Sequence, residues 1–381
     1  MFRNVPRRGR WAALIGVFSA GILTAAGVSA GAAAAQPQAR VPWARVGPGW
    51  ELVQYTNATP AKHAATTLYL IGPDGARYPL YTWRASASLP PVLAAWSGDK
   101  TRALLYEAAD GQVTQLNLLT GKLSRFRLAG QAQPAGYTRP RGLNILGTRA
   151  GGSGREAELA RYSLAGTLVK VLAENDGPSI TGVYSADGAT LAVSDARGLL
   201  LAGNAGGVIR RLPVPGTDQN MGCVPVRWWN AGTILAQCFA RPYDIARLWL
   251  VPASGARPAA LTPQRTPSGR DLGDIDAWRL PSGLYLQSLG ACGTLEFNRQ
   301  AANGSVTPVS VPGTLNTDNQ VLTALGPRLL IDARTSCEGS DSLLWFNPGT
   351  RAEQWLLRAP AGAFGVLAAV PYYSGENAPA L

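Results

Sequence analysis

Short apolar stretches alternate with glycine-centred turns along most of this chain, and the same order of stretches returns at a regular interval. The turn glycines stand 41 to 49 residues apart, at Gly75, Gly121, Gly166, Gly207, Gly255, Gly304 and Gly349. A period in the forties with several short strands in each unit is typical of β-propeller blades. The pattern therefore predicts an all-β chain.

The clearest unit runs from Leu93 to Leu128. Its expected strands are Leu93–Trp96, Arg102–Glu107, Gln112–Leu118 and Lys122–Leu128. Their alternation of apolar and polar residues is imperfect, as expected for a sheet that neighbours cover on both faces. The same order returns from Thr181, Val226, Asp276 and Val321, and a weaker copy spans Thr138 to Leu172.

The first unit is incomplete, because Trp50–Tyr55, Thr67–Ile71 and Arg77–Trp83 supply strands two to four without a first strand. Near the other end of the chain, Phe364–Val370 looks like a first strand that nothing follows. We expect this C-terminal strand to pair with the N-terminal blade and close the ring, which hides sheet edges. The prediction is a single β-propeller over residues 46–376 with seven four-stranded blades, six or eight being the alternatives.

The N-terminus has the order of an export signal. Arginines at positions 3, 7, 8 and 10 precede an apolar stretch from Trp11 to Val28, and Ala33-Ala34-Ala35 ends a run of small residues. We expect residues 1–35 to be a signal peptide, 36–45 a linker and 377–381 a tail. Sec export is favoured over the twin-arginine route, and an uncleaved membrane anchor is the alternative. The expected location is extracytoplasmic, either secreted or associated with the cell envelope.

Export makes disulfides expected, since they persist in oxidising compartments. The four cysteines are Cys223, Cys238, Cys292 and Cys337. Cys223 and Cys238 should face each other across one hairpin, and Cys292 and Cys337 each follow the second strand of consecutive blades. We expect the pairs Cys223–Cys238 and Cys292–Cys337, with Cys238–Cys292 as the rival pairing. With no Cys-x-x-Cys spacing and a single histidine, His63, a zinc site is not expected.

The formal net charge of +12 is scattered along the chain. No basic run with interleaved aromatics marks nucleic-acid binding, so we expect no nucleic-acid partner. A basic surface favours anionic partners.

Two turns carry a family resemblance. Trp96-Ser97-Gly98-Asp99 and Tyr184-Ser185-Ala186-Asp187-Gly188 are similar to the aromatic-Ser-x-Asp-Gly turn of TolB-like propeller repeats. The opening Val46–Trp50 and the export signal resemble secreted TolB-like proteins of actinobacteria. The resemblance implies an extracytoplasmic protein-binding role at the cell envelope. A seventh blade departs from the six-bladed propeller of TolB.

Candidate chemistry is sparse. Asp271, Asp274 and Asp276 form the densest carboxylate group and raise the question of a cation such as calcium. Strand-start capping, with Arg270 as an ion-pair partner, is the favoured interpretation. His63 lies in a polar loop without a nucleophile signature, and the glycines at 151, 152 and 154 lack the Lys-Ser/Thr of a phosphate-binding loop. We expect no metal, cofactor or catalytic residue.

The sequence favours a monomeric, non-enzymatic scaffold that binds a protein or envelope component, through the loop face of Cys292 and Cys337. The alternative is a propeller enzyme, a hydrolase or lyase acting on glycans or lactones, with carboxylates in the central channel. A third hypothesis is a ligand sensor held by an uncleaved anchor.

Overall fold

The computed structural model describes residues 41–57, 65–84, 90–151, 157–175, 180–195, 198–214, 222–240, 245–262, 272–290, 294–335 and 340–372. Apart from two 3-10 turns, Trp43–Arg45 and Ala129–Gln131, all regular structure in these ranges is β-strand. No helix there is long and apolar enough to cross a membrane. The predicted all-β class is confirmed.

Five of the sheets in the described ranges have four strands. They comprise β4 (Val92–Trp96), β5 (Arg102–Glu107), β6 (Gln112–Asn117) and β7 (Leu123–Phe126); β8 (Gln133–Tyr137), β9 (Ile145–Ala150), β10 (Ala157–Tyr162) and β11 (Leu168–Asn175); β12 (Gly182–Tyr184), β13 (Thr190–Asp195), β14 (Gly198–Gly203) and β15 (Val208–Leu212); β16 (Gly222–Asn230), β17 (Thr233–Ala240), β18 (Ile245–Pro252) and β19 (Ala259–Ala260); β20 (Asp274–Leu280), β21 (Gly283–Leu289), β22 (Leu295–Gln300) and β23 (Val306–Pro308).

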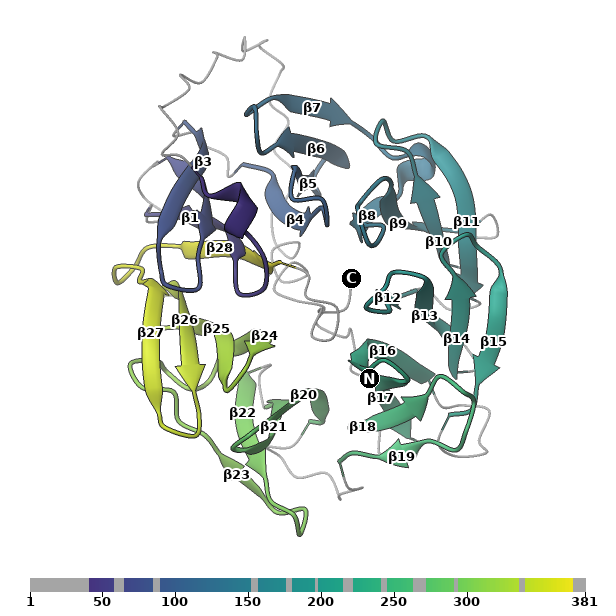
Figure 1. Ribbon diagram of the computed structural model, residues 1–381, viewed down its shortest axis with the longest axis vertical. Helices are drawn as coiled ribbons and strands as arrows, with labels where there is room; N and C mark the ends of the chain where they lie inside the picture. The colour runs from purple at the N-terminus through teal and green to yellow at the C-terminus, as the bar shows by residue number, and fades with distance from the viewer. Residues whose placement is uncertain are drawn as a thin grey trace, which may run out of the picture. The chain divides into compact units, whose positions relative to one another are not determined.

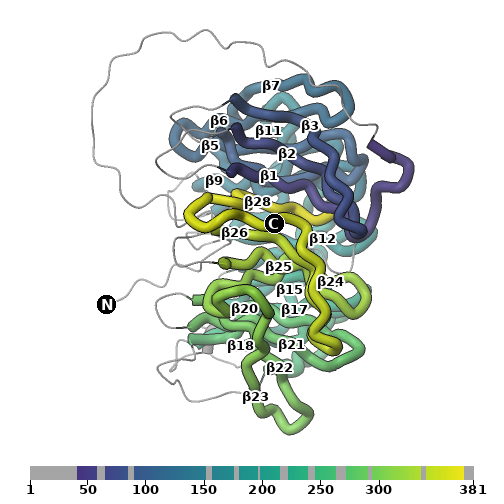
Figure 2. The backbone as a smooth tube through the Cα atoms, turned by 90° about the vertical axis from the view of Figure 1, so that its left-hand side faces the viewer, coloured from purple at the N-terminus to yellow at the C-terminus, as the bar shows by residue number. Residues whose placement is uncertain are grey.

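The sixth sheet is mixed and joins the two ends of the repeat. It contains β24 (Gln320–Leu325), β25 (Arg328–Arg334), β26 (Asp341–Asn347), β27 (Ala352–Leu357), β28 (Gly365–Pro371), β1 (Glu51–Thr56), β2 (Thr66–Ile71) and β3 (Arg77–Trp83). The C-terminal β28 pairs antiparallel with β1, as the sequence predicts, and touches β26 through one parallel bridge between Asp341 and Gly365. Figure 2 shows β1, β28 and β26 following one another.

Successive sheets follow one another around a common centre, as Figure 1 shows, with β4, β8, β12, β16, β20 and β24 nearest to it. Seven apolar clusters fill the spaces between them, each built from two neighbouring groups of strands. One example joins Ala95 and Leu104 of the β4–β7 sheet to Ile145 and Ala160 of the β8–β11 sheet. Apolar burial between sheets, rather than inside any one of them, therefore holds the fold together.

The turn glycines behave as the repeat predicts, with one exception. Six of them adopt positive φ, and at Gly166 (φ 88°) an added Cβ would lie 2.3 Å from a main-chain oxygen of the neighbouring sheet. Gly349 does not, and Arg351 takes the left-handed conformation in that turn instead, at φ 61°. In the seventh turn, the residue with positive φ therefore stands two positions later than the repeat predicts.

One boundary differs from the sequence analysis. The weak third copy begins at Gln133 instead of Thr138, because β8 includes Pro134 and Gly136 and shifts register between them. In the stretch expected as a linker, Val41 and Trp43 pack against the apolar cluster between β1–β3 and β4–β6.

Candidate functional site

The turn between β4 and β5 is built by a serine and an aspartate. Ser97 Oγ donates to Asp99 Oδ1 over 2.6 Å, and the same oxygen accepts the backbone N–H of Thr101 over 3.0 Å. Burial alone would raise the pKa of Asp99. Hydrogen bonds from Ser97 and Thr101 and the charge of Arg102 outweigh burial and lower this pKa. The carboxylate is therefore ionised and committed to the turn.

The turn between β12 and β13 repeats this arrangement. Ser185 Oγ donates to Asp187 Oδ1 over 2.6 Å, and Asp187 Oδ1 accepts the backbone N–H of Ala189 over 2.9 Å. The Ser185 hydrogen bond is the main cause of a lowered pKa at Asp187. The two turns that carry the TolB-like motif therefore share one hydrogen-bond pattern.

The β8–β9 loop, residues 138–144, lies between these two regular turns and is clamped by both. A Cβ on Gly98 would lie 1.7 Å from the carbonyl oxygen of Pro140, and one on Gly188 would lie 2.7 Å from the carbonyl carbon of Arg139. The backbone N–H of Asp99 donates to Arg141 O over 3.0 Å. Glycine in the flanking turns thus gives the loop room to pack closely.

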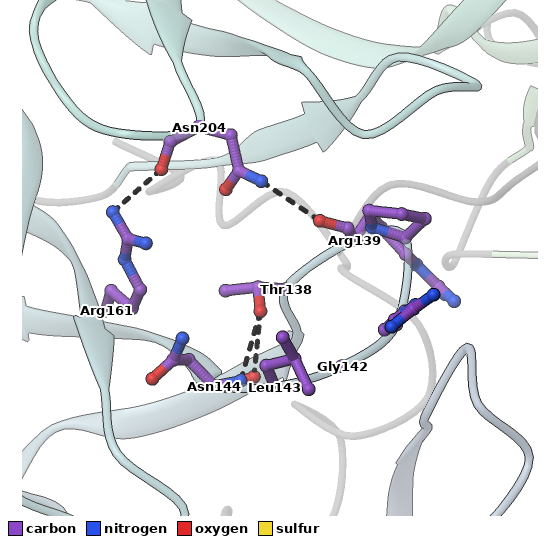
Figure 3. Close-up of a pocket in the computed structure, with 9 residues that line it drawn as sticks. Thr138, Arg139, Gly142, Leu143, Asn144, Arg161 and Asn204 are labelled. Carbon is purple, nitrogen blue, oxygen red and sulfur yellow. Dashed lines mark hydrogen bonds between the residues drawn. The ribbon is translucent and has the colours of Figure 1, made fainter.

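A pocket of about 220 Å³ opens beside this loop. The described residues that line it come from the loop, from β10 and from the β14–β15 turn; they are Thr138, Arg139, Pro140, Arg141, Gly142, Leu143, Asn144, Arg161 and Asn204. In Figure 3, Arg161 and Arg139 lie on opposite sides of the space, with Asn204 above and Asn144 below. Among these described residues, three are arginines and none is an aspartate or glutamate.

Asn204 holds the Arg161 guanidinium in place. One terminal amino group donates to Asn204 O over 2.8 Å, and Asn204 Nδ2 in turn donates to Arg139 O over 3.0 Å. The buried Nε of Arg161 has no acceptor within the described part of the chain. The pocket therefore offers guanidinium donors in a positively charged setting, which suits an oxyanion. It supplies no nucleophile paired with a base.

Two members of the predicted aspartate group, Asp274 and Asp276, lie at the start of β20 and bond to charged and polar side chains. Asp276 forms an ion pair of 2.7 Å with Arg227, and Asp274 lies 3.6 Å from Arg247 and accepts from Ser288 over 2.9 Å. Both arginines come from the β16–β19 sheet. Arg270 lies outside the described residues, so its ion pair stays a prediction.

These ion pairs occupy the junction between the β16–β19 and β20–β23 sheets, where the apolar cluster has only four buried members. Burial raises the pKa of Asp276 to about 6, against the lowering effect of Arg227. No group of three or more His, Cys, Asp or Glu in the described ranges is placed to hold a metal. Asp271 lies outside those ranges. The charges of Asp274 and Asp276 are used to join two sheets.

The disulfide between Cys223 and Cys238 is confirmed. The two residues are direct partners in the β16–β17 register, with Cα atoms 4.1 Å apart, and both are buried. Cys292, Cys337 and His63 lie outside the described residues, as do Gly152 and Gly154. The bond Cys292–Cys337 stays a prediction.

The sequence analysis did not single out the arginine pocket. Its walls come from residues 43 positions apart, Arg161 and Asn204, which meet only when two sheets pack. One local signal was present, since Thr138–Asn144 departs from the Ser-x-Asp pattern of the turns on either side.

Solved structures with a similar fold include peptidases. A structure from a study of two prolyl endopeptidases is 15% identical, with a TM-score of 0.56, and the match covers 81% of this chain and 50% of that one. A puromycin-hydrolyzing peptidase of Mycobacterium tuberculosis is 15% identical, with a TM-score of 0.51 and coverage of 78% and 50%. The chain thus spans about half the length of these two proteins.

TolB proteins are also among the structural matches. TolB of Acinetobacter baumannii is 14% identical, with a TM-score of 0.42 and coverage of 88% of this chain and 67% of that one. No protein-family profile and no curated protein matches the sequence. The fold shared with the peptidases at this low identity places the chain among propeller-like all-β proteins.

Proposed function

We propose that the chain is a seven-bladed β-propeller closed between β28 and β1. The eight-stranded sheet then counts as two blades, β24–β27 and β28–β3, joined through the single bridge at Asp341 and Gly365. Seven apolar clusters support this count, because a closed ring of seven blades has seven junctions. The last cluster joins Val53 and Ile71 of the first strands to Leu330 and Leu343 near the end of the chain.

We propose further that this propeller is an exported, non-enzymatic scaffold that binds a protein or another component of the cell envelope. The observation that carries the proposal is the arginine pocket on the face formed by the first-to-second-strand turns. Three arginines, with no carboxylate among the described residues that line the pocket, favour binding of an anionic partner over acid–base chemistry. The loop face on which the sequence predicts Cys292 and Cys337 stays a second binding prediction.

Export is supported by two features of the chain. The arginine-rich, then apolar N-terminal stretch has the order of an export signal, and the Cys223–Cys238 disulfide is of a kind that persists in oxidising compartments. N-terminal sequencing of protein recovered from outside the cytoplasm tests this. A mature chain that starts at Gln36 supports cleavage, and a retained Met1 supports an anchor.

The binding function is tested by capture from envelope extracts on immobilised protein. Arg141 lines the pocket and is exposed, so Arg141→Glu reverses one charge there; Arg125→Glu makes the same change on the exposed outer strand β7. We expect wild type and Arg125→Glu to retain the same partner and Arg141→Glu to lose it. Capture of no specific partner by the wild type would overturn the proposal.

A second function, peptide or other hydrolysis, is favoured by the peptidase structures among the neighbours. Propeller-like fold alone does not transfer that activity. A fluorophosphonate probe, which labels activated serines, and a panel of fluorogenic peptide, glycan and lactone substrates distinguish the two functions. Labelling of a serine, or turnover that survives further purification, would favour the enzyme.

A further inference from the structure

We propose that the arginine pocket is a carboxylate-binding site that takes an acidic side chain of a bound peptide next to an apolar residue. The inference rests on the proposed binding function and adds the chemistry of what is bound. Its basis is the arrangement around Arg161, Asn204 and the 138–144 loop.

The donors are prearranged. Arg161 is half-buried, and its bond to Asn204 O fixes the guanidinium, while Asn204 is itself tied to Arg139 O. Tyr184 Oη lies 3.3 Å from Asn204 Oδ1, which ties the amide from its other end. A guanidinium held in this way loses little conformational freedom when it binds.

The lining of the pocket is also positively charged. Arg139, Arg141 and Arg161 line it, and no carboxylate does so among the described residues. A bound oxyanion accepts hydrogen bonds from guanidinium groups and reduces the repulsion among these like charges. The charge of the lining therefore favours an anionic ligand over a neutral one.

The size and rim of the pocket narrow the class of ligand. At about 220 Å³ it is smaller than sites that hold whole cofactors or drug-sized molecules, which are roughly 300–1,000 Å³. A single carboxylate with a few carbon atoms fits this space. Leu143 on the rim is 64% exposed and offers an apolar contact directly beside the charged pocket. A peptide with adjacent acidic and apolar side chains satisfies both features.

Two carboxylates in the turns beside the loop already have other partners. Asp99 pairs with Arg102, and Asp187 serves its own turn through Ser185 and Ala189. The site is thus flanked by acidic residues that are already bonded. An incoming carboxylate meets the arginines of the pocket as its main electrostatic partners.

The test uses saturation-transfer NMR with the folded full-length protein and two probes, N-acetyl-Leu-Glu-amide and N-acetyl-Leu-Gln-amide. We expect saturable binding of the glutamate probe and at least tenfold weaker binding of the glutamine probe. Arg161→Gln should weaken the glutamate probe at least tenfold, and the matched Arg125→Gln should not. Equal binding of the two probes, or unchanged binding to Arg161→Gln, would overturn the assignment.

If Arg161→Gln fails to fold, Asn144→Asp provides an independent test of the pocket. This change keeps the side-chain shape and places a carboxylate in the pocket, where it should displace the glutamate probe and raise the melting temperature. Unchanged binding to Asn144→Asp would count against the site. Inorganic phosphate serves as the other anion source, and tighter binding of phosphate than of the glutamate probe would overturn the choice of a carboxylate.

Repeating the envelope capture with Arg161→Gln separates this inference from the proposed function. If Arg161→Gln still captures the partner, the pocket assignment fails and the scaffold function stands. If wild type binds the glutamate probe but captures no partner, the function fails and the pocket assignment stands.

Discussion

Glu51→Gln should change how the stability of this protein depends on pH. Glu51 is the first residue of β1, lies between Ile71 and Pro371 in the sheet, and is completely buried. Neither carboxylate oxygen has a hydrogen-bond partner in the described part of the chain. Because alternate strand residues share a face, Glu51 points to the same side as Val53, toward the apolar cluster that contains Trp345.

Burial in this setting raises the pKa of Glu51 well above its ordinary value of 4.5. The folded protein therefore keeps the proton at pH values where the unfolded chain has released it, so stability falls as pH rises. For one proton the slope is at most about 1.4 kcal/mol per pH unit, from the unfolded pKa up to the folded one. Glutamine does not ionise, so the stability of Glu51→Gln does not show this part of the decline with rising pH.

Urea unfolding of wild type and Glu51→Gln between about pH 5 and about pH 8 measures the effect. The free energy of unfolding of the variant minus that of wild type should grow as pH rises and then level off. For Glu353→Gln, on the exposed outer strand β27, the free energy of unfolding should change with pH in the same way as that of wild type. A difference for Glu51→Gln that stays constant over this range would refute the reasoning.

Three further changes test contacts that stabilise the fold, and urea unfolding measures the free energy of unfolding of each variant. Replacing Cys223 and Cys238 together by alanine removes a crosslink over a separation of 15 residues. We expect the free energy of unfolding to fall by about 3 kcal/mol, and a reducing agent should cause the same loss in wild type. Gly166 has a positive φ, and an added Cβ would press against a carbonyl oxygen just after β7. Gly166→Ala should therefore lower the free energy of unfolding by about 1–3 kcal/mol. Arg227→Met leaves Asp276 without its ion-pair partner and should lower the free energy of unfolding by about 3–5 kcal/mol. Adding Asp276→Leu should restore most of that stability. Equal losses in the single and double variants would contradict this.

Much of the fold could be predicted from the sequence because its signals are local. The strand Arg102–Glu107 has the predicted bounds, and Cys223 and Cys238 pair as the position of their hairpin requires. Strand β8 was missed because Pro134 and Gly136 interrupt the apolar pattern, and a register shift between them keeps the strand paired. Irregular pairing of this kind leaves little trace in hydrophobic periodicity.

The site was harder to predict because its contacts join separate sheets. Asp276 pairs with Arg227 of β16 and Asp274 with Arg247 of β18, and a reading along the chain did not find these two arginines. In a repeat of short sheets, side chains near strand ends meet the next unit, tens of residues away. Spacing within one unit therefore predicts turns and strands better than ion pairs.

The arginine pocket shows why departures from the repeat are informative in this chain. The turns before and after it use the same serine–aspartate pattern, and their carboxylates are consumed by their own hydrogen bonds. The 138–144 loop lacks that pattern, and its residues line the pocket together with Arg161 and Asn204. Glycines at 98 and 188 belong to the regular turns, yet their missing side chains let the irregular loop pack closely. The regular turns thus hold the divergent loop in place, and this loop forms one wall of the pocket.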